Sequence, residues 1–281
     1  MKKPRDTEDT LAAARLYLAS MPRGSDDRAL FDDLKTFCMF LGYPRSGHSL
    51  IGGLLDAHPD IVIAQELDVL RYAAAGFRRR EIYHLLLENS RAAKEGGRKW
   101  GDYCYDVPNQ WQGRFRKLLV IGDKKGGGSL RRLHAEPELL GRLRQIVNLD
   151  IKFVHLVRNP YDNISTMARH RETRDLPLAN CIDSYFARCQ TFAKVRRHIA
   201  DADILEMKYE SFVADPKARL EELCRFLGVA AGAEYLSDCA GIVYESPHRS
   251  RYKVPWTDEG VETVRKRMLE FPFLAGYSYA T

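Results

Sequence analysis

Paired cysteines and long apolar runs are both missing from this sequence. Its six cysteines form no Cys-x-x-Cys pair, and no histidines stand near them at zinc-ligand spacing, so we expect no metal site. No run approaches the roughly 18–20 consecutive apolar residues that a membrane-spanning helix needs. The first residues, MKKPRD, lead into a polar stretch without the apolar core of a signal peptide. We therefore expect reduced thiols, no membrane span and a cytoplasmic protein.

A strong charge of one sign is missing as well. The chain has 44 basic and 38 acidic residues, which gives a net charge of +6. This modest excess suits an anionic ligand, but it is ordinary for a protein surface, and we expect no nucleic acid as a partner. Hydrophobic residues make up 45% and charged residues 29% of the 281 residues, a balance typical of folded proteins rather than disordered ones.

Short apolar runs alternate with helical patterns along most of the chain. The runs predict strands at residues 36–41, 61–64, 118–122, 151–157 and 203–207. The helical patterns predict helices at residues 7–21, 50–55, 67–95, 178–200 and 216–227, and another that begins near residue 257. We interpret residues 95–112 as a surface loop region. This alternation predicts an α/β fold with a central parallel sheet flanked by helices. We expect one domain over residues 1–281, with the N-terminal helix as an appendage.

The turn after the first predicted strand has the spacing of a phosphate-binding loop. Residues 42–49 read GYPRSGHS, the pattern GxxxxGxS, between a strand and a helix. In such a turn, backbone N–H groups and the N-terminus of the helix point at an anion. A nucleotide triphosphatase has lysine at the position of His48, whereas the cation inside this loop is Arg45. A chance glycine-rich turn is the alternative, but the strand, the helix and the cation together favour an anion site.

This loop resembles the 5′-phosphosulfate-binding loop of sulfotransferases that use 3′-phosphoadenosine-5′-phosphosulfate (PAPS), which commonly reads Pro-Lys/Arg-Ser-Gly-Thr-Thr. Residues 54–60, LLDAHPD, are particularly similar to tyrosylprotein sulfotransferases, which also use arginine in the loop. The resemblance implies the sulfotransferase fold with its P-loop-like turn, PAPS as donor, PAP as product and no metal. It assigns donor contacts to Arg45, Ser46, Gly47, His48, Ser49 and Leu50. The chain departs from the family pattern where His48-Ser49 replaces Thr-Thr.

The same resemblance implies a catalytic base at Glu66, 21 residues after Arg45. Glu66 lies at the carboxyl end of the second predicted strand, where open α/β sheets bind ligands. A carboxylate there can take the proton of an acceptor hydroxyl, although glutamate is also favourable at a helix start without any catalysis. His48 is the rival base because its ordinary pKa is near neutrality. In the turn GDKKGGG, a lysine resembles the one that, with Arg45, stabilises the transferring group. Lys124 aligns better than Lys125, by one residue.

A second motif follows the fourth predicted strand. Residues 157–167, VRNPYDNISTM, resemble the family's 3′-phosphate motif, with Arg158 at the strand end and Thr166 eight positions later. Ser165 is a close alternative to Thr166. An arginine suits an ester phosphate because its fork makes paired, charge-assisted hydrogen bonds.

Two weaker similarities lie in the C-terminal third of the chain. Tyr209 begins a Tyr-Glu segment similar to one in the family, where it packs near the nucleotide, although core packing explains it equally well. Arg251 and Lys253 belong to a basic stretch, residues 250–256, that resembles the family's late loop closing over the donor. A solvated basic surface is the alternative.

The leading interpretation is a sulfotransferase that moves a sulfuryl group from PAPS to a hydroxyl acceptor, by default a small molecule or a glycan. A small-molecule kinase using ATP and magnesium is the second interpretation, but it needs a lysine at position 48 or an aspartate at position 158. A nucleotide-sensing module without catalysis is the third. Residues 78–80 and 100–111 are candidates to line the acceptor pocket or are plain surface. The acceptor and the oligomeric state stay open at this point.

Overall fold

The computed structural model describes residues 4–20, 29–100, 103–170 and 176–280. Five strands form one parallel sheet in the order β2-β5-β1-β6-β7, which confirms the predicted fold class. The strands are β1 (Thr36–Gly42), β2 (Ile61–Ala64), β5 (Val120–Asp123), β6 (Asp150–Val157) and β7 (Ile204–Lys208). The α-helices are α1 (Pro4–Ser20), α3 (His48–Asp56), α4 (Val69–Ala74), α5 (Arg79–Glu95), α6 (Gly127–Ala135), α7 (Glu138–Val147), α8 (Pro160–Ala168), α9 (Leu178–Arg196), α10 (Tyr209–Ala214), α11 (Pro216–Phe226), α12 (Ala233–Gly241) and α13 (Asp258–Met268). Short 3₁₀ turns are η1 (Asp201–Asp203), η2 (Ser250–Lys253) and η3 (Pro272–Leu274).

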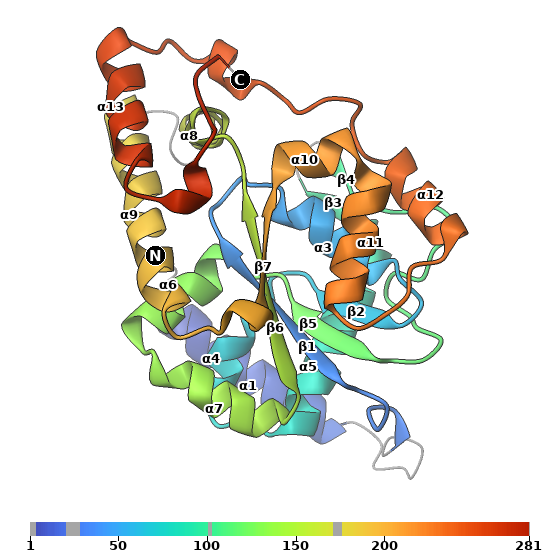
Figure 1. Cartoon of the computed structure of the whole chain (residues 1–281). Helices are drawn as coiled ribbons and strands as arrows, with labels where there is room; N and C mark the ends of the chain where they lie inside the picture. Colours follow the sequence, from blue (N-terminus) through green and yellow to red (C-terminus); the bar gives the residue numbers. More distant parts are fainter. Residues whose placement is uncertain (1–3, 21–28, 101–102, 171–175, 281) are drawn as a thin grey trace.

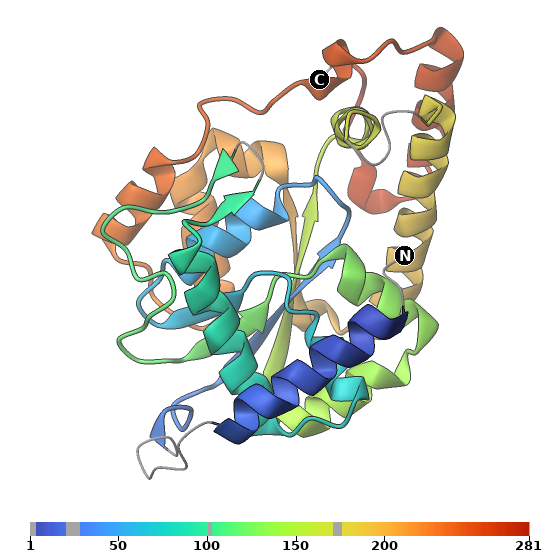
Figure 2. The same ribbon diagram turned by 180° about the vertical axis from the view of Figure 1, so that it is seen from behind.

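The central strand β1 is buried on both faces, which explains why it reads as an unbroken apolar run. Its side chains alternate between two hydrophobic clusters. Phe37, Met39 and Leu41 join the cluster under α1, α4–α7 and part of α9. Cys38 and Phe40 join the cluster under α3 and α10–α12. Figure 1 shows the sheet between these two helical layers, and Figure 2 shows α1 lying across the outer side of the first one.

The strand order places four turns at one edge of the sheet. From β1 the chain runs to the outer strand β2, returns to β5 beside β1, and then adds β6 and β7 on the other side. The direction of strand addition therefore reverses at β1. Ligands of open α/β sheets bind outside the carboxyl ends of the strands at such a switch point. The turns after β1, β2, β5 and β6 all open toward this carboxyl edge.

Several element boundaries differ from the sequence prediction. The single helix predicted at 67–95 is two helices, α4 and α5, because the chain turns at Gly76 with a positive φ of 79°. The N-terminal helix begins at Pro4, and residue 21 of the predicted range lies outside the described residues. The predicted loop at 95–112 contains a small antiparallel ladder of β3 (Lys99–Trp100) and β4 (Tyr103–Cys104). Helices α6, α7, α10 and α12 were not predicted. In the described part of the chain, no helix combines the length and apolar character needed to cross a membrane.

Candidate active site

The loop between β1 and α3 depends on Gly47. This residue has a φ of 102°, and a Cβ placed on it would stand 2.5 Å from a ring carbon of Tyr209. Both facts exclude a side chain at this position, since L-residues rarely adopt that backbone conformation. Arg45 is also left-handed, with a φ of 68°, and among the described residues its side chain makes no hydrogen bond. The loop thus presents a free guanidinium beside the N-terminus of α3.

His48 is buried inside this loop. Its Nε2 lies 3.2 Å from the carbonyl oxygen of Leu41 and its Nδ1 lies 3.0 Å from the Ser46 hydroxyl oxygen. A carbonyl only accepts hydrogen bonds, so Nε2 carries the proton, and the single Ser46 hydroxyl proton is shared between Nδ1 and the Tyr43 carbonyl oxygen at 2.9 Å. Burial and the nearby ammonium of Lys124 lower the pKa of His48 to about 3. The imidazole is therefore neutral, and both its nitrogens are engaged within the protein.

Glu66 and Lys124 meet at the ends of neighbouring strands. Strands β2 and β5 pair with Ala64 opposite Asp123, so the residues that follow them emerge side by side. The Lys124 ammonium lies 3.0 Å from Glu66 Oε1 and 3.1 Å from the Ser49 hydroxyl oxygen. The Lys125 ammonium lies 3.4 Å from Glu66 Oε2. One carboxylate thus faces two cations next to the donor loop.

The charge states in this cluster follow from its surroundings. Burial raises the pKa of Glu66, but Lys124 and Lys125 outweigh burial, and the pKa lies below its ordinary value. Burial lowers the pKa of Lys124, and Glu66 opposes that change. Gly52 on α3 makes the approach of the lysine possible, because a Cβ there would stand 2.8 Å from Lys124 Cγ. Lys124 is the buried lysine of the two, whereas a quarter of the Lys125 side chain is exposed.

Arg158 lies at the end of β6 and forms a second candidate anion site with its polar neighbours. We call this site and the loop between β1 and α3 the two cradles. The Arg158 guanidinium donates to the backbone oxygen of Arg45 at 3.3 Å and of His248 at 2.6 Å, and lies 3.4 Å from the hydroxyls of Thr166 and Ser250. Its buried Nε has no hydrogen-bond partner in the described structure. An orphaned buried donor is costly unless a ligand or water satisfies it. This cradle is therefore incomplete in the protein alone.

A model of the sulfotransferase family matches residues 39–232. The chain belongs to the sulfotransferase family. Its fold is similar to that of the sulfotransferase domain from the curacin biosynthetic pathway, with 16% identity, a TM-score of 0.53, and coverage of 85% of this chain and 99% of that one. It is also similar to sulfotransferase STF9 from Mycobacterium avium, with 13% identity, a TM-score of 0.53, and coverage of 95% and 83%. The search of curated proteins found no match.

The two hydroxyl candidates in the second motif of this sulfotransferase point in different directions. Thr166 Oγ1 faces Arg158 and the Ser250 hydroxyl. Ser165 is fully buried, and its oxygen accepts a hydrogen bond from Trp256 Nε1 at 2.9 Å. Of the pair, Thr166 is the one that shares the cradle with Arg158.

The other predicted donor contacts also differ in their surroundings. Tyr209 packs on Gly47 and lies 5.4 Å from the Arg158 guanidinium, so it joins the two cradles. Arg251 is fully buried, and its guanidinium donates to the Asp162 carboxylate and to two backbone oxygens near the C-terminus. Arg251 thus fastens η2 to α8. Lys253 is exposed at the end of η2.

An aromatic row, only part of which the sequence singled out, lies beside the two cradles. Tyr103 stacks on Tyr105, Tyr244 meets Tyr103 edge-on, and His248 meets Tyr244 with ring centroids 4.6 Å apart. The row runs from Tyr105, which abuts Gly53 of α3, to His248, whose backbone oxygen binds Arg158. The sequence signal was the aromatic segment 100–111, which was assigned to the acceptor pocket or to plain surface. Tyr244 and His248 carried no signal.

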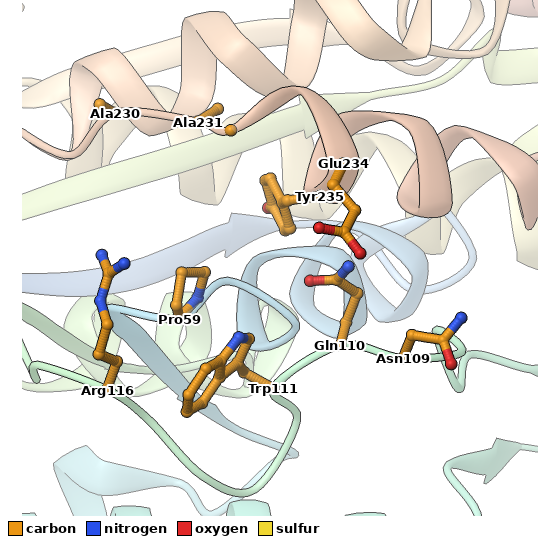
Figure 3. A pocket seen from close by; sticks show the side chains of 10 residues that line it. Pro59, Asn109, Gln110, Trp111, Arg116, Ala230, Ala231, Glu234 and Tyr235 are labelled. Carbon is orange, nitrogen blue, oxygen red and sulfur yellow. The ribbon is translucent and has the colours of Figure 1, made fainter.

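A hollow of about 510 Å³ lies away from these residues, and Figure 3 shows its lining. Pro59, Trp111 and Arg116 form one wall, and Tyr235 and the turn before α12 form the other. Pro59 precedes β2, so the hollow opens at the amino edge of the sheet, opposite Glu66. Within the described residues, no group of three or more His, Cys, Asp or Glu side chains could hold a metal ion.

Proposed function

We propose that this enzyme transfers a sulfuryl group from PAPS to a hydroxyl acceptor and releases PAP, with residues 1–281 acting as one domain. The observation that carries the proposal is the placement of two adjacent anion cradles, after β1 and β6, next to the Glu66–Lys124 pair after β2 and β5, along the carboxyl edge of the sheet. One cradle suits the 5′-phosphosulfate and the other suits the 3′-phosphate.

The donor fits both cradles through their unsatisfied groups. Residues 43–50 offer backbone N–H groups, the N-terminus of α3 and the free Arg45 side chain to the 5′ end. Arg158 offers its unpaired Nε, with the Thr166 and Ser250 hydroxyls beside it, to the 3′-phosphate. The adenine stacks on the aromatic row of Tyr103, Tyr105, Tyr244 and His248, since an exposed aromatic face is a general platform for a base.

Glu66 acts as the general base in the transfer step. The acceptor oxygen forms a bond to sulfur while the bond from sulfur to the bridging oxygen breaks. The hydroxyl proton passes to the Glu66 carboxylate, and the bridging oxygen leaves on PAP with its electron pair. Lys124 and Arg45 stabilise the charge that develops there. The low pKa of Glu66 keeps it ionised and able to accept the proton at neutral pH.

His48 serves the loop rather than the chemistry. Its protonated Nε2 donates to the Leu41 carbonyl oxygen and its Nδ1 faces the Ser46 hydroxyl, so neither nitrogen is directed at an acceptor. Gly42 and Gly126 make room for the ring, because a Cβ on either would stand close to it, at 2.8 and 3.1 Å. His48 therefore fills the space beneath the loop as a packed, neutral side chain.

The alternative of an ATP-dependent kinase fits these side chains less well. Position 48 holds this neutral histidine instead of a phosphate-binding lysine, and the strand end at 158 holds an arginine instead of a magnesium-binding aspartate. We keep a small molecule or a glycan as the acceptor class and the cytoplasm as the compartment, both as sequence predictions.

Ligand-induced stabilisation separates these alternatives. A ligand that binds the folded state raises the unfolding temperature by mass action. PAP should raise it strongly, and ATP much less, because ATP has no 3′-phosphate for Arg158. Equal stabilisation by PAP and ATP, or none by PAP, would contradict the proposal.

A further inference from the structure

The turn that carries Glu66 has an unfavourable backbone. Glu66 has a φ of 59° and Asp68 a φ of 70°, both in the left-handed region that disfavours residues with a Cβ. Two such residues within one turn persist only where the surroundings hold them, and such positions cluster at functional sites.

Side chains from other elements hold this turn by its backbone. The buried Asp123 carboxylate accepts from the N–H of Leu67 at 3.1 Å and from the N–H of Val69 at 2.8 Å. The Asn89 side chain accepts from the N–H of Gln65 at 2.6 Å. Hydrogen bonds therefore hold the backbone on both sides of Glu66, whereas the Glu66 carboxylate contacts Lys124 and Lys125.

A second contact that holds this turn comes from α6; we call it and the Asp123 contact the braces. Arg132 grips Asp68 with two parallel hydrogen bonds, from Nε at 2.7 Å and from a terminal nitrogen at 2.8 Å. This forked arrangement fixes orientation better than a single contact does. The elements that carry these two contacts also lead into the site, because β5 ends at Asp123, directly before Lys124, and α6 begins at Gly127, two residues after Lys125. The cations and the braces of Glu66 thus belong to one rigid unit.

We propose that Asp123 and the Arg132–Asp68 ion pair are positioning residues that aim the Glu66 carboxylate at the acceptor hydroxyl. This inference rests on the proposed role of Glu66 as base. The braces do not touch the donor cradles, so they govern the transfer rate and leave donor binding alone. A small misplacement of a catalytic group costs on the order of 100-fold in rate.

The chain offers a matched control at the other end of β2. Asp60 precedes β2 and receives a similar grip from Arg116, at 3.1 and 2.9 Å. Asp68→Asn should lower kcat by roughly 10- to 100-fold with an unchanged Kd for PAP, whereas Asp60→Asn should leave kcat within about 2-fold. Asp123→Asn should act like Asp68→Asn, because one of the two accepting oxygens becomes an NH2 group, which cannot accept from an N–H group.

Turnover would be measured with labelled PAPS and any acceptor the enzyme sulfates, alongside unfolding temperature, for Asp68→Asn, Glu66→Gln and the double variant. If the brace acts through Glu66, the double variant should be no slower than Glu66→Gln alone, since the effects of residues that work as a unit are not additive.

Independent losses that multiply in the double variant would overturn the inference, and so would a normal kcat in both Asp68→Asn and Asp123→Asn. Normal turnover in Glu66→Gln would instead refute the base itself, a failure of the proposed function that is separate from failure of the brace. Should Asp123→Asn fail to fold, the partly exposed Asp68 still decides the outcome.

Discussion

The two ends of β2 carry similar residue types in opposite arrangements. At the amino end, Asp60 is paired with Arg116, and both nitrogens of His58 lie in hydrogen bonds. At the carboxyl end, Glu66 faces two lysines, and Arg45 nearby makes no hydrogen bond among the described residues. The amino end has a hollow of about 510 Å³ (Figure 3), and its Asp60 carboxylate is paired with Arg116 within the protein. The carboxyl edge is distinguished by its cations, which outnumber the one carboxylate they face, and not by the hollow.

The largest expected effect concerns Glu66, the proposed base at the carboxyl edge. Glu66→Gln should keep the fold and the PAP affinity but slow transfer by roughly 100-fold or more, the usual scale for a lost general base. His48→Asn, assayed with the same acceptor, should retain more of the turnover because its nitrogens are already engaged. Near-normal turnover in the Glu66 variant together with collapse in the His48 variant would move the base into the loop.

Donor selection gives the next effect. Arg158→Ala should weaken PAP binding by about 1.5–3 kcal/mol, the scale of a charge-assisted hydrogen bond. Adenosine-5′-phosphosulfate lacks the 3′-phosphate and should lose much less affinity. Calorimetric titration of both ligands checks this, and an equal loss for both would show that Arg158 does not select the 3′-phosphate.

Glycine substitutions compare the two edges directly. Gly47→Ala forces a strained φ and a contact with the Tyr209 ring, so it should cost about 1–3 kcal/mol of stability and reduce donor affinity. Gly232→Ala, beside the hollow at the amino edge, meets nothing within 4 Å and should change stability by at most about 0.5 kcal/mol. Denaturant unfolding measures both; a Gly47→Ala protein as stable as the Gly232→Ala protein would contradict the packing described for the loop.

The last prediction is a pH dependence of stability caused by His48. Burial, Lys124 and His155 lower its pKa in the folded protein to about 3, from an ordinary 6.5. As the pH falls, the unfolded chain binds a proton at His48 before the folded protein does. The free energy of unfolding therefore keeps its full value above pH 6.5 with respect to His48, and it decreases as the pH falls from 6.5 toward 3. Unfolding free energy measured across that range should fall less steeply in His48→Asn than in the wild type. An identical slope in both proteins would mean that folding does not lower the pKa of His48; the exposed His134 supplies the control substitution.

The sequence predicted the parts of the site that are local in the chain. The phosphate loop and the Arg158 motif are strand–turn–helix segments, whose residue spacing and types indicate anion binding. Glu66 was predictable as a strand-end residue, but the brace from Asp123 was not, because it joins residues more than 50 positions apart. The burial of Arg251 and the row from Tyr103 to Tyr244 are likewise tertiary contacts without a local pattern. The break between α4 and α5 was missed because helical periodicity continued across a single glycine.

Transfer of a sulfuryl group from PAPS at the carboxyl edge of the sheet is the central proposal for this enzyme. The most direct measurement incubates the enzyme with PAPS carrying a labelled sulfuryl group and a panel of hydroxyl acceptors, and follows the products by mass spectrometry. The account predicts that label appears on an acceptor hydroxyl together with an equal amount of PAP, and that Glu66→Gln suppresses both. Transfer of phosphate from ATP to the same panel, with no label transferred from PAPS, would contradict it.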